Sequence, residues 1–177
     1  SCGFSASLIR YHVDTGRYIR ARRGIYRLRD YPPFYREHVV IAWLRLGPDR
    51  AVVSHESALD LYELSDVIPN ATHLTIPRTS NWTPNIRGTR IHTRTRPWQP
   101  GDVRIQEGLP VTSPERTIMD AAEMGTGPEQ IEMAIMQALE RGITTPNRLR
   151  SAGANSSFRV KSLVEQGISL AQERLAR

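Results

Sequence analysis

Arginine side chains are concentrated in the first 36 residues of this 177-residue chain. Eight arginines stand there against only two acidic residues, Asp14 and Asp30, so this stretch accounts for the whole formal net charge of +6. The planar guanidinium fork suits phosphates and the hydrogen-bonding edges of bases. The distribution therefore favours contact with nucleic acid. The alternative is an ordinary helix and hairpin whose arginines only keep the surface solvated.

A short helix would position the first of these side chains. Residues 5–15 (SASLIRYHVDT) predict a helix that Ser5 caps and Gly16 ends. At about 100° per residue, one side of this helix is apolar and the other is polar. The residues expected to reach base edges are Ser5, Ser7, Arg10, Tyr11 and Asp14.

The next segment, residues 18–29 (YIRARRGIYRLR), predicts two short strands around a turn at Arg23-Gly24. Residues 20 and 22 share a face of a strand, as do residues 27 and 29, so the ribbon could align several guanidinium groups along a DNA backbone or minor groove. The wing residues and their flanks expected to contact DNA are Arg17, Tyr18, Arg20, Arg22, Arg23, Arg27 and Arg29.

The sequence Tyr31-Pro32-Pro33 predicts a domain boundary, with one unit over residues 1–31 and a larger domain over residues 32–177. Helices are expected at residues 34–46, 54–64, 114–124, 128–141 and 158–175, and strands at 51–53, 73–76, 89–93, 103–106 and 110–112. The predicted fold class is α+β, with a partial winged helix-turn-helix before a mixed α/β domain that ends in helices.

Several sequence blocks carry a family resemblance in the same order along the chain. They are GFSASLIRYHVDTGRYIRARRGIYRL, VVSHESALDLYEL, HLTIPR, IHTRTRP, EGLPVTSPERTIMDAA and QALERGITTPNRLRSA. The ordered set resembles the AbiEi family, antitoxins of type IV toxin–antitoxin and abortive-infection systems of bacteria, and covers most of the chain up to about residue 125.

The resemblance implies a transcriptional autoregulator that binds operator repeats in its own promoter through the N-terminal unit, an arrangement compatible with a homodimer on DNA. It also implies that the larger domain counteracts a nucleotidyltransferase-like toxin, without a stable complex being required. In the family two helices precede the recognition helix, whereas only Ser1–Phe4 precede it here. We therefore expect upstream residues to be missing from this sequence.

Enzymatic functions find little support in the residue pattern. A metal-dependent nuclease needs clustered carboxylates near a lysine, but the single lysine, Lys161, has no acidic residue two positions before it, and no D-x-D occurs. The five histidines are scattered, without H-x₃-H spacing or a cysteine pair, so no zinc site is expected. His55 and Glu56 follow Ser54 at a predicted helix start, where capping explains them. No catalytic residue, cofactor or metal is expected.

Two other functions stay open, a plain winged-helix transcription factor without a toxin partner and a pure interaction module. A second basic segment, residues 78–104, contains Trp82 and Trp98 and could contact phosphates or simply be a solvated loop. Cys2 is the only cysteine, so an internal disulfide is impossible, and no apolar run approaches membrane-spanning length. These features predict a soluble cytoplasmic protein that does not bind membranes.

Overall fold

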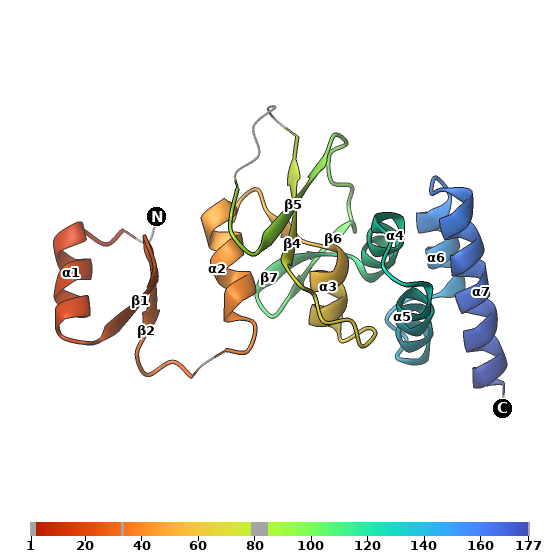
Figure 1. The fold of residues 1–177 in the computed structure, drawn as a ribbon, viewed down its shortest axis with the longest axis horizontal. Helices are drawn as coiled ribbons and strands as arrows, with labels where there is room; N and C mark the ends of the chain where they lie inside the picture. The colour runs from red at the N-terminus through yellow and green to blue at the C-terminus, as the bar shows by residue number, and fades with distance from the viewer. Residues whose placement is uncertain (1–2, 33, 79–84, 177) are drawn as a thin grey trace.

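The computed structural model describes residues 3–32, 34–78 and 85–176 (Figure 1). Within these residues the chain forms seven helices, a two-stranded sheet and a five-stranded mixed sheet, which confirms the α+β class. The small sheet and the helix before it lie at one end of the molecule, and the C-terminal helices lie at the other (Figure 1). The described helices include none with the length and apolar character that crossing a membrane would require.

The N-terminal unit consists of one helix and one hairpin. Its elements are α1 (Ala6–Asp14), β1 (Tyr18–Arg22) and β2 (Ile25–Leu28). The strands pair antiparallel around the turn at Arg23-Gly24, where Gly24 has a φ of 77° that the missing side chain makes accessible. The expected helix and hairpin are therefore both present.

The five-stranded sheet forms the centre of the larger domain. Its strands are β3 (Val52–Val53), β4 (Thr72–Pro77), β5 (Thr89–Arg94), β6 (Val103–Gln106) and β7 (Leu109–Thr112). They lie in the order β5-β4-β3-β7-β6, in which β4–β5 and β3–β7 are parallel and the other two pairs are antiparallel. The strand β5 is thus an edge strand held by β4 alone.

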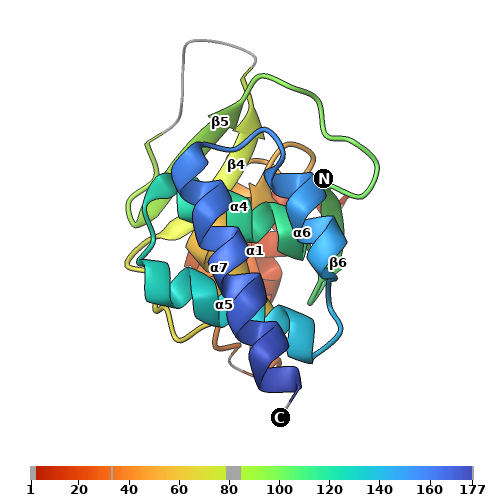
Figure 2. The same cartoon turned by 90° about the vertical axis from the view of Figure 1, so that its right-hand side faces the viewer.

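Helices cover both faces of this sheet. They are α2 (Glu37–Leu46), α3 (His55–Tyr62), α4 (Pro114–Met124), α5 (Pro128–Glu140), α6 (Pro146–Gly153) and α7 (Phe158–Leu175). The helix α2 lies on the face turned toward the hairpin, and α3 and α4 lie on the other (Figure 1). Beyond them α5, α6 and α7 form an outer helical layer, which α7 crosses diagonally (Figure 2).

Apolar side chains along one side of α5 and of α7 hold that layer together. Ile131, Ile135, Val160 and Ile168 are all fully buried between α5 and α7 and their neighbours. Leu175, at the end of α7, is 61% exposed. The reason is that Arg174 already pairs with Glu140, the last residue of α5, so Leu175 lies beyond the helix against which α7 packs.

One helix begins later than the sequence predicts. The helix α2 starts at Glu37 instead of residue 34, after Arg36, whose backbone is not helical. The Arg36 side chain is almost buried and donates hydrogen bonds to Asp60 and Glu107, which belong to two distant parts of the chain. The local pattern alone predicted a helix from residue 34. In the structure the helix begins only after Arg36, the residue that makes these long-range contacts.

Candidate functional site

The helix α1 presents a polar face to solvent. Ser7, Arg10, Tyr11 and Asp14 are all exposed and follow the i, i+3, i+4, i+7 spacing of one helix side. Arg10 and Asp14 form an ion pair of 3.7 Å, but both side chains are more than two-thirds exposed. Such a pair contributes little to stability and can be exchanged for a contact with a ligand.

Ser5 and Tyr18 serve structural contacts instead of standing free on that face. The Ser5 hydroxyl accepts a hydrogen bond from the backbone N–H of Leu8 at 3.2 Å, so it caps the helix as the sequence predicts. The ring of Tyr18 is half-buried and packs on His12, with ring centroids 4.8 Å apart. His12 therefore belongs to the side of α1 that packs on the hairpin, as expected.

The register of the hairpin places Arg20 and Arg27, which the sequence predicted to be aligned along the ribbon, on different faces. Ile19 pairs with Arg27, whereas Arg20 pairs with Tyr26 on the other face, and the register shifts between Arg20 and Arg22. Arg27 is half-buried and forms an ion pair of 3.4 Å with Glu37 of α2. The hairpin is thus joined to α2 through a residue that we had expected to contact DNA.

Arg29, like Arg27, has a partner within the protein, so neither guanidinium is free for the predicted DNA contact in this structure. Arg29 lies beyond the end of β2, and its Nε donates a hydrogen bond to the carbonyl oxygen of Gly16. It closes the turn between α1 and β1, while Arg27 is engaged by α2. The physical reason is that both guanidinium groups find acceptors within the protein, one a carboxylate and the other a carbonyl.

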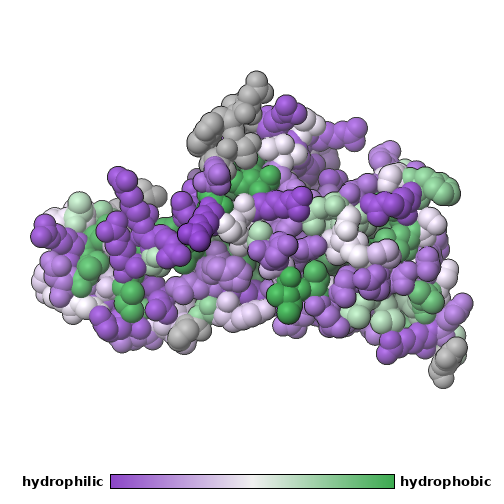
Figure 3. Space-filling view, viewed as in Figure 1, coloured by the Kyte–Doolittle hydropathy of each residue, from purple (hydrophilic) through white to green (hydrophobic). Residues whose placement is uncertain are grey.

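Three other arginines of this unit carry unpaired charge. Arg17, Arg20 and Arg23 are exposed and form no ion pair or side-chain hydrogen bond with any residue in the described part of the chain. Arg22 is exposed as well, and its guanidinium reaches only the carbonyl of Ala21, at 2.9 Å. Hydrophilic residues accordingly cover much of this end of the molecule, between smaller apolar areas (Figure 3).

A cleft extends this positive surface toward the larger domain. It has a volume of about 440 Å³ and lies between the hairpin, α2 and the segment before β5. The charged residues that line it are Arg22, Arg27, Arg45, Arg87 and Glu37. Four guanidinium groups against one carboxylate give the cleft a positive potential.

One arginine of the second basic segment, Arg94, is engaged within the protein. Arg94 stacks over the ring of Trp98 at 3.8 Å and contacts Asp102 at 3.4 Å. Its guanidinium also donates to the carbonyls of Arg96 and Pro97, so it holds this loop together. Trp82 lies outside the described residues. Arg78, Arg87, Arg90 and Arg96, by contrast, are exposed and form no ion pair or side-chain hydrogen bond with any described residue, so this segment carries unpaired charge as the hairpin does.

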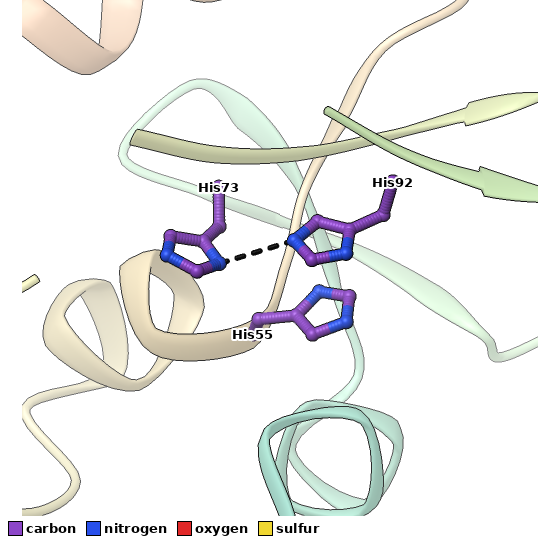
Figure 4. A group of neighbouring side chains, drawn as sticks. All are labelled: His55, His73 and His92. Carbon is purple, nitrogen blue, oxygen red and sulfur yellow. Dashed lines mark hydrogen bonds between the residues drawn. The ribbon is translucent and has the colours of Figure 1, made fainter. Parts of the chain in front are cut away.

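A cluster of three histidines was missed by the sequence reasoning. His55, His73 and His92 each contribute one ring nitrogen to a group in which all three nitrogens lie within 4.8 Å of one another (Figure 4). His55 begins α3, His73 lies in β4 and His92 lies in β5, so no short sequence spacing links them. The parallel register, which pairs Thr75 with His92, places His73 and His92 on one sheet face below the start of α3.

All three rings of this cluster are neutral near pH 7. Burial lowers the pKa of His55 to about 3 and the pKa values of His73 and His92 to about 4. Neighbouring positive charge lowers them further, because the charge of Arg90 opposes protonation of each ring. The cluster therefore offers imidazole lone pairs, not cations.

The capping explanation for His55 and Glu56 is wrong in its details. Ser54 occupies the N-cap position, but its side chain makes no capping hydrogen bond. Its hydroxyl oxygen instead lies 2.9 Å from Nδ1 of His55 and accepts a hydrogen bond from Thr75 at 2.8 Å. Histidines in or beside buried strands were the only sequence signal for this arrangement.

Comparison with known proteins gives a fold and no family. No family model and no curated protein sequence matches the chain. The chain is similar in structure to the RV2827C protein from Mycobacterium tuberculosis, known from a crystal structure, with a TM-score of 0.60 and 16% sequence identity. The likeness covers 99% of this chain and 70% of that one. At this identity the likeness establishes a shared overall fold.

Proposed function

We propose that the protein is a DNA-binding transcriptional regulator that reads duplex DNA with α1 and holds the backbone with the β1–β2 hairpin. The observation that carries the proposal is a set of exposed arginines in one small unit, Arg17, Arg20 and Arg23, none of which pairs with another described residue. Phosphate contacts supply most of the affinity of such proteins, and Arg and Lys supply most of those contacts.

The relation between the helix and the hairpin supports this reading. The inner side of α1 packs on an antiparallel hairpin and its outer side is polar, which is what the proposal requires of a recognition helix and its wing. Arg10 lies on the outer side of α1, and it lines one small hollow together with Arg20 of the hairpin. A guanidinium that reaches guanine and one that reaches phosphate would therefore act side by side.

The cleft between the hairpin and α2 supports a larger footprint. Arg45 and Arg87 belong to the larger domain, yet they line the same cleft as Arg22 of the hairpin. In the proposal the phosphate backbone continues across this cleft. The larger domain would then add contacts that carry affinity without sequence information.

The antitoxin role forms the second part of the proposal. It is supported by the ordered sequence blocks that resemble the AbiEi family, and it assigns autoregulation of the promoter to the N-terminal unit. The expected result is that co-expression of the full chain restores growth to cells that express a nucleotidyltransferase encoded beside it. A chain that binds promoter DNA but gives no such rescue would instead be a plain transcription factor.

The DNA-binding proposal is tested by measuring the affinity of the full chain for its own upstream promoter at two or more salt concentrations. Arg10→Ala should weaken discrimination between promoter and unrelated duplex. The double variant Arg22→Ala/Arg23→Ala should weaken binding to both duplexes alike and flatten the slope of log affinity against log salt by about 2, since each phosphate contact contributes about 0.9.

A matched control removes the same amount of charge from the other end of the molecule. Lys161 and Arg174 are exposed residues of α7, far from the hairpin in Figure 1. Lys161→Ala/Arg174→Ala should leave affinity and salt slope as in the parent chain. Equal behaviour of the hairpin and α7 double variants would disprove the assignment of the surface.

A further inference from the structure

We propose that His55, His73 and His92 form a binding site for one divalent transition-metal ion, with Zn²⁺ as the expected occupant. The site lies in the larger domain, on α3, β4 and β5, and its existence does not depend on DNA binding (Figure 4). Imidazole nitrogen is a preferred ligand of zinc and of its neighbours in the first transition row.

Two of the three rings already have the separation that a shared ion requires. Zinc–nitrogen distances of about 2.0–2.1 Å in tetrahedral geometry place two ligand nitrogens about 3.4 Å apart. Nδ1 of His73 and Nε2 of His92 are 3.1 Å apart and point toward each other (Figure 4). To bind one ion, the two rings must part slightly and turn, so that the lone pairs that now face each other meet at one point.

The third ring lies next to this pair but must turn. His55 stacks on His92 with ring centroids 3.6 Å apart and an interplanar angle of 14°. Rotation about the side-chain bonds of His55 is needed for its nitrogen to face the same point. The backbone of His55 has a φ of 53°, which costs a non-glycine residue about 1–3 kcal/mol and is concentrated at functional positions.

Groups behind the ligands orient the rings. Nε2 of His73 is buried and makes no hydrogen bond with any described residue, and the nearest carboxylate oxygen, Oε2 of Glu56, lies 3.9 Å away. The other oxygen of Glu56 accepts a hydrogen bond from Thr126 at 2.9 Å. A proton on Nε2 of His73 would face this carboxylate, which leaves Nδ1 free for the ion. Metal-bound histidines characteristically direct their second nitrogen to such a partner.

A second such partner serves His55. Its Nδ1 lies 2.9 Å from the hydroxyl oxygen of Ser54, an oxygen that Thr75 also approaches at 2.8 Å. If Nδ1 donates to Ser54, the lone pair of Nε2 becomes available. Ser54 is thus engaged by the cluster and not by the end of its own helix.

Charged side chains surround the cluster, and one coordination position stays open. Arg90 and Arg116 bring positive charge near the rings, and the Glu56 carboxylate opposes it. Because His92 is only partly buried, a fourth position is left for water or another small ligand, the coordination that three protein ligands usually leave.

The experiment uses the untagged full chain, stripped with a chelator and titrated with Zn²⁺ by calorimetry, and with Co²⁺ while the visible spectrum is recorded. The expected result is one bound ion per chain, together with the intense visible absorption of four-coordinate cobalt. The melting temperature should rise when Zn²⁺ is added, because the ion binds the folded chain only.

Variants assign the ligands. His92→Gln changes the most accessible of the three rings and should reduce zinc affinity by more than the roughly 10–100-fold that loss of an outer-shell partner costs. Glu56→Gln should fall within that roughly 10–100-fold range and still give the four-coordinate cobalt spectrum. His38→Gln, at an exposed histidine of α2, should bind zinc as the parent chain does.

The result that would overturn the proposal is equally concrete. One such result is that the parent chain takes up no more zinc than His92→Gln does, and that His92→Gln and Glu56→Gln melt as the parent does with and without zinc. The three histidines would then be a packed neutral cluster and not a metal site. Circular dichroism of His92→Gln shows whether it is folded. If this variant is unfolded, the parent chain decides alone: failure of the parent chain to bind one zinc ion per chain overturns the proposal.

Discussion

Two short helices of this protein, α1 and α3, are similar in length but differ in how much of each is buried. The helix α1 has nine residues and none of them is buried, whereas α3 has eight residues and buries six. The outer face of α1 carries Arg10 and Tyr11 into solvent, while α3 places Leu59 and Leu61 in the core. The comparison indicates that α1 contributes mainly exposed side chains, whereas α3 contributes mainly to the core of the larger domain.

The two regions also treat charge differently. Arg20 and Arg23 are exposed on the hairpin and pair with no residue in the part of the chain that the structure describes. Arg36 of the larger domain is 6% exposed and is held by Asp60 and Glu107. The same residue type is thus left exposed on the hairpin and held in a buried ion-pair network in the larger domain, and the experiments below test this difference.

The largest expected effect comes from removing the buried arginine. Arg36 donates three hydrogen bonds, to the carboxylate and carbonyl oxygen of Asp60 and to the carboxylate of Glu107. Arg36→Ala leaves these acceptors without their partner, which for a fully buried pair costs about 3–5 kcal/mol. Because Asp60 and Glu107 keep some solvent contact, we expect a loss of about 2–3 kcal/mol in the free energy of unfolding, measured in urea.

Arg23→Ala is the matched control for this measurement. Arg23 is exposed at the hairpin turn and forms no ion pair within the described residues. Its removal should change the free energy of unfolding by no more than about 0.5 kcal/mol. Equal losses in the two variants would show that the hairpin arginines are structural, which would break the comparison.

The same comparison explains what the sequence could predict. The positions of α1, the hairpin and the C-terminal helices follow from local patterns, such as the stripe of Ile131, Ile135 and Ala138 that the structure buries. Periodicity and turn residues act over a few positions, so they can be recognised without knowing the fold. The concentration of charge near the N-terminus is a property of composition and was equally visible.

The contacts that the sequence could not predict depend on register and on long-range pairing. His55, His73 and His92 come together because β4 and β5 run parallel and because α3 begins above them. The pairing of Arg27 with Glu37 likewise depends on how α2 lies against the hairpin. Neither arrangement has a local signature, since each is fixed by chain crossings that many sequences could make.

A second test concerns packing within the helical layer. A methyl group at Gly167 of α7 would lie 2.8 Å from Cδ1 and 3.3 Å from Cβ of Ile135 in α5. Because Ile135 is fully buried and β-branched, it cannot move freely, and overpacking costs about 1–3 kcal/mol. Alanine regains up to about 1 kcal/mol of helix propensity, so Gly167→Ala should have a net cost of about 1 kcal/mol in urea unfolding.

Gly153→Ala supplies the control in a neighbouring helix. Its methyl group would lie 3.3 Å from the sulfur of Met119, a flexible side chain that can shift. The propensity gain should then prevail, and the variant should be stabilised by up to about 1 kcal/mol. If both variants are stabilised, the α5–α7 contact is looser than described, and the interior of this domain would resemble α1 more closely.

The smallest expected effect compares a buried with an exposed tyrosine. The hydroxyl of Tyr62 donates a hydrogen bond to the carbonyl of Thr112 at 3.0 Å, whereas Tyr11 on α1 is 60% exposed. Tyr62→Phe leaves that carbonyl without its donor and should reduce the free energy of unfolding by about 1 kcal/mol. Tyr11→Phe should leave it unchanged.

The pH dependence of that difference tests burial directly. Burial raises the pKa of Tyr62 to about 12, above its value of about 10 in the unfolded chain. The parent chain therefore loses stability as the pH rises from about 10 toward 12, because the unfolded state releases the phenol proton first. Tyr62→Phe lacks this loss, so the gap between the two chains should narrow over that range. A gap that stays constant in urea titrations from about pH 8 to about pH 11 would mean that the Tyr62 hydroxyl is as solvated as that of Tyr11.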